Sequence, residues 1–457
     1  MIHVLALCAL LTVDIPKTWA QADVETLEIP APNPAFHLDE RTYYQIPERV
    51  IYKTYAVYAP GREPAGYKQW LESREPEIAF DASKLNTPED WTRAGELVFN
   101  MPTSFKPVFF TAANLRDSEF YRQTGMPVAS DGVAPFARWV VRKKGVLELG
   151  SMGCNTCHTR VLTDGTVVPG AQGNNPNDRQ GALLLDASDK TLTRLRSFAS
   201  QFQLPWIADD INRLTETMTI GEFIKAGEEI PAGVTARANT SMILPPQIPD
   251  LIGVQERRFL DHTGLIRQRS IGDLMRYSSL AQDLFSQDRY GSQPPRNVAL
   301  PDARYSDPQL YALALYLYSL RPPKNPHPFD DSASRGQAIF KREKCDTCHA
   351  PPLYTNNSLI AADTLGVDPR YTLQTRKSTG YYKVPSLKGV WYRGPFGHNG
   401  SAATLEDWLD RARIKPDYVP TGFKGYDGKT RSIPGHTFGL KLSLAERKDL
   451  IAFLNTL

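Results

Sequence analysis

Two copies of one five-residue motif hold the residues of this chain that are best suited to chemistry. The first is CNTCH at Cys154–His158 and the second is CDTCH at Cys345–His349. The chain has five cysteines, so only Cys8 lies outside the two motifs. Each motif places two thiols and one imidazole within about one turn of chain, where they could hold a metal or a covalently bound cofactor.

Four interpretations of a Cys-x-x-Cys pair were compared. A disulfide framework is disfavoured because a chain of 457 residues is long enough to bury its own hydrophobic cores. A single zinc site usually has its cysteine pairs about 15–20 residues apart, whereas Cys154 and Cys345 lie roughly 190 residues apart. A thioredoxin-like redox pair does not require the histidine that follows.

Covalent haem attachment does require that histidine. Each thiol forms a thioether with a vinyl group of the haem, and the histidine ligates the iron. Because the complete motif occurs twice, the sequence predicts a c-type cytochrome with two covalently bound haem c groups. The residues expected to hold them are Cys154, Cys157, His158, Cys345, Cys348 and His349.

Haem attachment of this kind takes place outside the cytoplasm, and the N-terminus carries a matching export pattern. Val4–Val13 is an apolar run too short to span a bilayer, and Thr18 and Ala20 suit a cleavage site after residue 20. We therefore expect residues 1–20 to be a signal peptide, removed together with Cys8, and the mature protein to be periplasmic or secreted. Because no basic residue precedes the run, a buried N-terminal strand is the alternative.

Composition excludes several classes of partner. No other segment approaches the ~18 apolar residues of a transmembrane helix, so no stable membrane insertion is expected. The net charge is only +3, which gives no reason to expect nucleic acid or an anionic membrane surface as a partner. The chain contains 36 prolines and 31 glycines, and this predicts long loops around the cofactors.

Two helices with the same start signal are expected at corresponding places in the two halves. Ser306 with Gln309, and Ser443 with Glu446, are capping boxes that precede leucine-rich runs of helical spacing. A third box is expected at Ser334–Gln337, just ahead of the second motif.

These signals divide the chain. The sequence predicts a mainly α-helical protein with two cytochrome c-type haem domains, long loops and an irregular N-terminal region. The expected segments are a signal peptide at 1–20, the irregular region at 21–109, a first haem domain at 110–320, a proline-rich linker at 321–331 and a second haem domain at 332–457.

Longer stretches around the motifs point to a family. The carrying segments are ELGSMGCNTCHTRVLTDGTVVPGAQGN, DLIGVQERRFLDHTG, VPSLKGVWYRGPFGHNGSAATLEDWLD and GHTFGLKLSLAERKDLIAFL. From about Glu96 to the C-terminus, the chain resembles the dihaem cytochrome c peroxidase superfamily. It is most similar to the rubber oxygenase branch, whose members are haem dioxygenases that cleave polyisoprene.

The resemblance implies different roles for the two haems. The C-terminal haem would transfer electrons, with His349 on one side of its iron and His436 of GHTFG on the other; His398 of FGHNG is the alternative ligand. An imidazole at this position favours a six-coordinate, low-spin iron. The N-terminal haem would be the reaction centre, with His158 as its metal ligand and its opposite face open.

The sequence departs from the superfamily where the surroundings of the N-terminal haem are expected. Relatives have Phe-Trp-Asp where this chain has Phe259-Leu260-Asp261, and their tryptophan relays electrons between the haems. Leucine has no π-system, which leaves Trp206 or Trp391 as substitutes. The catalytic candidates are His158, Phe259, Leu260 and His262.

The glutamate that peroxidases use as a proton carrier is also missing. No glutamate occurs between Asp261 and Phe285, and Gln268 and His262 are the nearest polar substitutes. An apolar wall is expected instead, which suits O2 and a greasy substrate better than peroxide, although the same stripe could be ordinary helix core. The wall comprises Phe259, Leu260, Ile271, Leu274 and Met275.

The superfamily also has a calcium ion between its domains. The resemblance places Ca2+ here near Asn239 and the backbone of Arg393–Pro395, with arginine at a position where relatives have threonine.

Three functions remain. The first is O2 activation at the His158 haem on an apolar, olefinic substrate, small or polymeric. The second is reduction of H2O2 with electrons that a small redox protein delivers to the C-terminal haem. The third is a pure electron carrier with two six-coordinate irons. The missing glutamate separates the first two, and the coordination number separates both from the third.

Overall fold

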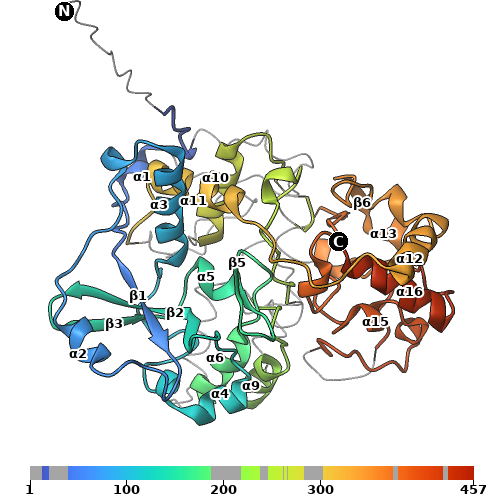
Figure 1. The fold of residues 1–457 in the computed structure, drawn as a ribbon, viewed down its shortest axis with the longest axis horizontal. Helices are drawn as coiled ribbons and strands as arrows, with labels where there is room; N and C mark the ends of the chain where they lie inside the picture. Colours follow the sequence, from blue (N-terminus) through green and yellow to red (C-terminus); the bar gives the residue numbers. More distant parts are fainter. Residues whose placement is uncertain are drawn as a thin grey trace, which may run out of the picture.

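The computed structural model describes residues 13–19, 40–186, 218–236, 245–260, 262–264, 266–282, 302–373, 379–425 and 431–457. Figure 1 shows two lobes in this part of the chain, a larger N-terminal lobe and a smaller C-terminal one, joined by an extended segment. Several positions named in the sequence analysis lie outside these ranges: Val4, Cys8, Ala20, Trp206, Asn239, Asp261 and Phe285.

A three-stranded antiparallel sheet organises one side of the larger lobe. Its strands are β1 (Thr54–Tyr58), β2 (Val133–Lys143) and β3 (Val146–Gly150), in the order β1-β2-β3. In β1, every second residue is buried, as expected for a strand with one face on a core. Tyr55 and Leu149 flank Trp139 of the central strand. Because β1 belongs to this sheet, the prediction that residues 21–109 are irregular is wrong for this segment.

Two helices form the other side of the larger lobe. Helix α3 (Pro88–Asn100) packs against α11 (Asp307–Ser319), the helix that ends the lobe. A Cβ atom at Gly95 would lie 2.0 Å from the backbone oxygen of Ala312, so this close approach requires glycine. The N-terminal region is therefore part of the larger lobe. The capping box of Ser306 and Gln309 is formed as predicted.

The larger lobe contains further helices and strands. They are α1 (Glu40–Gln45), α2 (Tyr67–Glu72), α4 (Ser118–Thr124), α5 (Cys154–Cys157), β4 (Thr159–Val161), β5 (Val167–Pro169), α6 (Asn177–Asp186), α9 (Ile220–Glu228) and α10 (Ile271–Gln282).

The smaller lobe is built on two helices that correspond to α3 and α11. Helix α12 (Asp331–Arg342) packs on α16 (Leu444–Asn455), and a Cβ atom at Gly336 would lie 1.9 Å from the backbone oxygen of Asp449. The box of Ser443 and Glu446 is formed as predicted. The box at Ser334 is not, because Asp330 caps α12 and places Ser334 inside the helix.

Short elements complete the smaller lobe. They are η8 (Cys345–Thr347), β6 (Leu359–Ala361), α13 (Ala362–Leu365), α14 (Arg370–Leu373), β7 (Tyr381–Lys383), α15 (Leu405–Trp408) and η10 (Arg411–Ile414).

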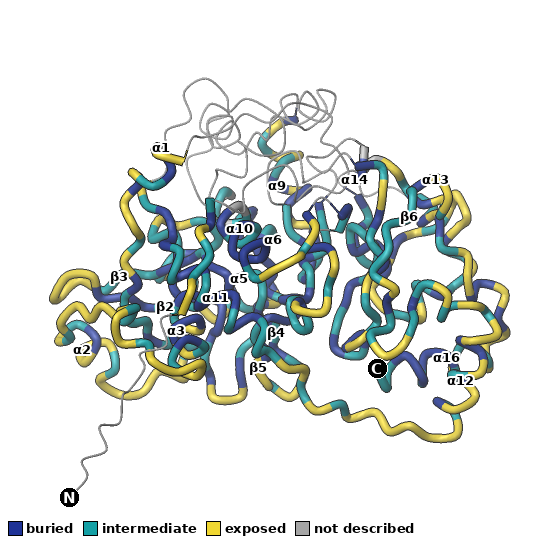
Figure 2. The backbone as a smooth tube through the Cα atoms, turned by 90° about the horizontal axis from the view of Figure 1, so that it is seen from above, coloured by how far each residue is buried: buried dark blue, intermediate teal, exposed yellow. Residues whose placement is uncertain are grey.

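The segment between α11 and α12 has no regular structure over residues 321–330 and is mostly exposed, as Figure 2 shows along one edge of the molecule. The proline-rich linker predicted at 321–331 covers this segment and the first residue of α12. Both lobes combine helices with small sheets, and the sheets were not part of the predicted fold class. In the parts of the chain that are described, no helix has both the length and the apolar character needed to cross a membrane.

Candidate functional sites

The first motif forms a single helical turn that is fastened to the sheet. In α5, the backbone N–H of His158 donates to the carbonyl of Cys154 at 2.8 Å. The side chains of Asn155 and Thr156 donate to backbone carbonyls of β2 at 2.9 and 3.1 Å. The two residues between the cysteines therefore anchor the turn, and the cysteines and the histidine remain for a cofactor.

The second motif repeats this geometry in η8. The backbone N–H of His349 donates to the carbonyl of Cys345 at 2.9 Å. No disulfide joins any two of the four motif cysteines in this structure. Nor do any three His, Cys, Asp or Glu side chains within the described ranges form a group that could hold a metal ion, so the zinc interpretation gains no support.

Both motif histidines are oriented through the same ring nitrogen. The Nδ1 atom of His158 lies 3.1 Å from the carbonyl of Pro249, and Nδ1 of His349 lies 3.1 Å from that of Pro385. Because a carbonyl only accepts hydrogen bonds, Nδ1 carries the proton in each ring and Nε2 keeps its lone pair. This is the arrangement of a metal-ligating histidine, and together with the two adjacent thiols it fits haem c.

A second imidazole faces His349. The ring centroids of His349 and His436 are 6.3 Å apart and the rings are inclined at 60°. A metal–imidazole bond is about 2 Å long and a ring nitrogen lies about 1 Å from its centroid, so two axial imidazoles on one ion would have centroids roughly 6 Å apart. The observed separation fits one metal ion between the two rings.

The surroundings of His436 keep its ring neutral. Burial, together with the nearby His349 and Arg413, lowers the pKa of His436 to about 4. The ring lies 5.7 Å from that of Trp408 and 5.5 Å from that of Phe438. Its Nδ1 atom is buried without a hydrogen-bond partner. A neutral, buried imidazole is the form that a metal requires.

The alternative ligand, His398, has a different setting. Its ring stacks on Tyr382 with centroids 3.6 Å apart and planes inclined by 14°. Burial lowers the pKa of His398 to about 4, so it too is neutral. Because the His398 ring stacks on Tyr382 while the His436 ring faces His349, the geometry favours His436 as the partner of His349.

The predicted apolar wall is buried beside the first motif. Leu260, Leu274 and Met275 belong to the same hydrophobic cluster as Cys154, and Ile271 packs against that cluster. Phe259 is buried as well. The structure thus brings the wall and the first cysteine together, which is compatible both with a pocket wall and with helix core.

The two polar substitutes near this wall are engaged elsewhere. The side-chain amide of Gln268 donates to the carbonyls of Val254 and Arg257, each at 2.9 Å, and so closes the turn η6 (Val254–Glu256). The Nε2 atom of His262 lies 3.1 Å from the carbonyl of Gln247. Both side chains are thus held by backbone carbonyls, and their catalytic role stays a prediction.

Trp391, one of the two proposed relay residues, lies where the lobes meet. It packs with Tyr392 against Val168 and Ala171, which follow the first motif, in one small cluster. Its ring is 5.9 Å from that of His327 in the linker. Leu260 is 7% exposed in the cluster of the first motif, so no aromatic ring occupies the place that relatives give to tryptophan.

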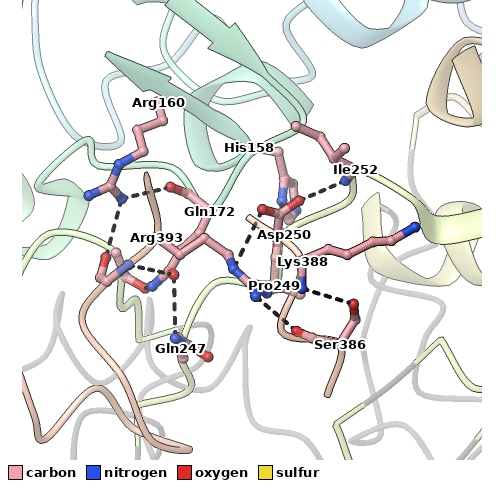
Figure 3. Close-up of polar contacts among 12 residues, drawn as sticks. His158, Arg160, Gln172, Gln247, Pro249, Asp250, Ile252, Ser386, Lys388 and Arg393 are labelled. Atoms are coloured by element: carbon pink, nitrogen blue, oxygen red, sulfur yellow. Dashed lines mark hydrogen bonds and ion pairs between the residues drawn. The ribbon is translucent and has the colours of Figure 1, made fainter. Parts of the chain in front are cut away.

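Polar side chains of the larger lobe donate hydrogen bonds to the backbone carbonyls near which the resemblance places calcium (Figure 3). Arg160 donates to the carbonyl of Gly394 at 3.2 Å, and the amides of Gln172 and Gln247 donate to that of Pro395 at 3.1 and 2.5 Å. A carbonyl oxygen that already accepts N–H groups is a poor cation ligand. The described part of this junction therefore does not fit Ca2+.

Two charged residues near the sites were missed by the sequence analysis. Burial raises the pKa of Asp178 to about 7, although the N–H of Ala236 donates to its carboxylate; its neighbour Asn177 donates to the sulfur of Cys157 at 3.4 Å. Arg413 is fully buried and contacts the backbone of His436. Neither residue lies in a recognisable motif, so its burial could not be read from the sequence.

Parts of the chain are similar in sequence to known proteins. No family model matches the chain. Methylamine utilization protein MauG of Methylorubrum extorquens is 31% identical over 134 residues, which cover 27% of this chain and 34% of that protein. Cytochrome-c peroxidase IdrP1 of Denitromonas iodatirespirans is 37% identical over 163 residues, which cover 27% of this chain and 40% of the relative. The resemblance to the dihaem peroxidase superfamily is confirmed.

The similarity to these relatives covers only part of each protein. The matches span between about a third and two fifths of the relatives' own lengths. A solved MauG-like protein associated with microbial copper homeostasis aligns with 59% of this chain at 15% identity, but its TM-score of 0.32 is too low to establish a common fold. The closer resemblance to the rubber oxygenase branch stays a prediction.

Proposed function

We propose that this protein is a dihaem c-type oxidoreductase in which the two haems have different tasks. Substrate chemistry takes place at the His158 haem, and the haem between His349 and His436 transfers electrons. The separation of 6.3 Å between the rings of His349 and His436 carries this proposal, because an ion held by both rings would be closed to substrate, whereas the first motif adjoins an apolar cluster. The two superfamily relatives, a MauG and a cytochrome-c peroxidase, support the same class.

The roles of the residues follow from their contacts. When bound, each haem supplies an iron that exchanges electrons and, where a coordination position is open, binds a small molecule such as O2 or peroxide. The motif thiols would attach the cofactor, and the carbonyls of Pro249 and Pro385 hold the rings of His158 and His349 through Nδ1, which leaves Nε2 available as an iron ligand. His436 closes the second site, while Phe259, Leu260 and the α10 side chains exclude water from the first.

We further propose that O2 is the oxidant and an apolar olefin, small or polymeric, is the substrate. The apolar cluster beside Cys154 would favour such a substrate, and the amide of Gln268 is committed to backbone carbonyls. Loss of a proton shuttle typically lowers a rate by a factor of about 10²–10⁴, so peroxide turnover would be slow. Attachment of haem c implies maturation outside the cytoplasm, so the protein would be periplasmic or secreted. The proposal includes no calcium ion between the lobes.

Reduction of H2O2 is the second candidate, favoured by the relative named as a cytochrome-c peroxidase. Stopped-flow mixing of the reduced protein with H2O2, beside oxygen uptake on squalene or polyisoprene latex, separates the two. The proposal predicts oxygen uptake with an alkene and slow peroxide turnover with a reduced cytochrome. Fast peroxide turnover without oxygen uptake would support the peroxidase instead.

A further inference from the structure

We infer that Arg413 is a positioning residue that holds His436 in place as a ligand of the second haem. The inference rests on the proposed function, because it takes His436 to be that ligand. Arg413 lies in η10 and is fully buried. Its Nε donates to the carbonyl of Trp408 at 2.7 Å, Nη1 donates to that of Ile433 at 2.5 Å, and Nη2 donates to those of Gly435 and His436 at 2.9 and 2.8 Å.

The backbone that Arg413 binds is strained at the ligand itself. Gly435 and His436 have φ angles of 80° and 48°, so two consecutive residues are left-handed. Glycine adopts this conformation freely, but a histidine does so only where surrounding contacts impose it. A Cβ atom at Gly435 would also lie 2.2 Å from a side-chain carbon of Val367. The bridge from Nη2 to both carbonyls fixes the peptide on each side of the His436 Cα.

The hydrogen bonds from Arg413 to the backbone of Gly435 and His436, called the clamp below, take the place of the Nδ1 hydrogen bonds that orient the other two histidines. His158 and His349 are oriented by hydrogen bonds from Nδ1 to backbone carbonyls, whereas Nδ1 of His436 has no partner. The orientation of the His436 ring toward His349 therefore has to come from its backbone and from apolar contacts. Arg413 supplies the largest set of backbone contacts to this loop.

The side chain must be arginine for geometric reasons. A guanidinium presents five N–H groups in a rigid plane, and here its three nitrogens reach four carbonyls of two separate segments. A lysine ammonium would offer three donors from one atom and could not span the same set. No carboxylate in the described ranges pairs with Arg413; its charge lies 4.6 Å from the ring centroid of Trp408.

The uncompensated charge gives a second observable. The Trp408 ring contacts both groups, with its centroid 4.6 Å from the Arg413 guanidinium and 5.7 Å from the His436 ring. A buried positive charge beside a haem disfavours the oxidised, more positive iron, so it raises the reduction potential of that haem. Arg413 thus acts on both the coordination and the potential of the second haem.

The test compares four variants of the full-length protein with its haems attached: Arg413→Met, Arg413→Lys, His436→Ala, and Arg335→Met as the control. Arg335 pairs with Asp449 on the exposed α12–α16 face, so its loss reports a general effect of removing an arginine from this lobe. Near-infrared and electron paramagnetic resonance spectra give the low-spin fraction of the second haem, and imidazole is then added to each variant.

We expect Arg413→Met to lose most of the low-spin signal of the second haem, as His436→Ala does, and imidazole to restore it in both. Arg413→Lys should retain an intermediate fraction, and Arg335→Met should match the parent protein. Any low-spin fraction left in Arg413→Met should have a lowered potential.

Three results would contradict the inference. In the first, Arg413→Met or Arg413→Lys keeps the parent spectrum and potential while His436→Ala loses the low-spin form; ligation by His436 then stands without the clamp. In the second, imidazole cannot repair the Arg413→Met spectrum, which assigns Arg413 to the fold of the lobe alone. In the third, His436→Ala stays low-spin, so the proposed ligation fails and the clamp fails with it.

Discussion

The two Cys-x-x-Cys-His sites share their attachment turn and differ in what lies across from it. Each turn is closed by the same hydrogen bond from the histidine N–H to the first cysteine, at 2.8 and 2.9 Å, and each histidine ring is fixed through Nδ1. His349, however, faces the ring of His436, whereas the first motif adjoins an apolar cluster with Leu260 and Leu274.

The covalent attachment of each haem and the proposed role of that haem depend on separate parts of the chain. The five-residue motif determines covalent chemistry locally. Whether an iron stays open or is closed depends on a segment far away in sequence, such as the loop of Gly435 and His436. The two sites therefore need different tests.

The largest expected effect is the loss of one haem. Replacing Cys154 and Cys157 together by serine removes both thioether bonds of the first site, and replacing Cys345 and Cys348 does the same for the second. Each double variant should contain one haem per chain where the parent contains two, measured by the pyridine haemochrome assay. One haem in the parent protein, or bound zinc, would end the dihaem proposal.

The next largest effect is expected at the second haem, which His436 is proposed to close to small ligands. His436→Ala should convert the second haem to a high-spin form that binds cyanide or CO, because the partner ring of His349 is lost. His398→Ala is the matched control, since it removes a ring stacked on Tyr382 instead, and its spectrum should remain low-spin. The opposite pattern would make His398 the ligand.

A smaller effect tests the apolar cluster. Leu274 is 3% exposed within the hydrophobic cluster that contains Cys154, so Leu274→Ala should lower the free energy of unfolding by about 2–5 kcal/mol. Leu450→Ala in the core of the other lobe is the control for a fully packed site. A much smaller loss for Leu274→Ala, measured by urea unfolding, would indicate a side chain that faces open space instead of solid core.

The smallest effect is a pH dependence beside the first motif. Burial raises the pKa of Asp178 to about 7, so the folded protein favours the protonated carboxyl. Its contribution to stability is complete below the pKa of an unfolded aspartate, about 4, and is lost as the pH rises through about 7. Asp178→Asn keeps an acceptor for the N–H of Ala236 but cannot ionise.

The thermal midpoint of the parent should therefore fall by a few degrees relative to Asp178→Asn between pH 5 and pH 8. Differential scanning calorimetry at both pH values gives the comparison. A constant gap between parent and variant would show that Asp178 keeps an ordinary pKa.

Sequence patterns predicted the features that depend on neighbouring residues. The capping boxes at Ser306 and Ser443 form, and both motifs adopt the expected turn. The predicted start of α12 was wrong because Asp330 offers an earlier cap, and a short strand such as β1 carries too little periodicity to be recognised without its partner β2.

Features that depend on distant contacts escaped prediction. The resemblance pointed to His436, but its left-handed backbone and the clamp from Arg413 follow from tertiary packing. An arginine in a charged stretch is ordinarily solvated, and nothing in its neighbours shows that Arg413 is buried. The raised pKa of Asp178 likewise depends on burial that only the fold provides.

The difference between the two sites is tested most directly by counting the CO molecules that the fully reduced protein binds. With His436 opposite His349 and an apolar cluster beside the first motif, the account predicts one CO per chain. The Cys154→Ser/Cys157→Ser variant should then bind none. Two CO molecules per parent chain, or none, would contradict the assignment of one open and one closed haem.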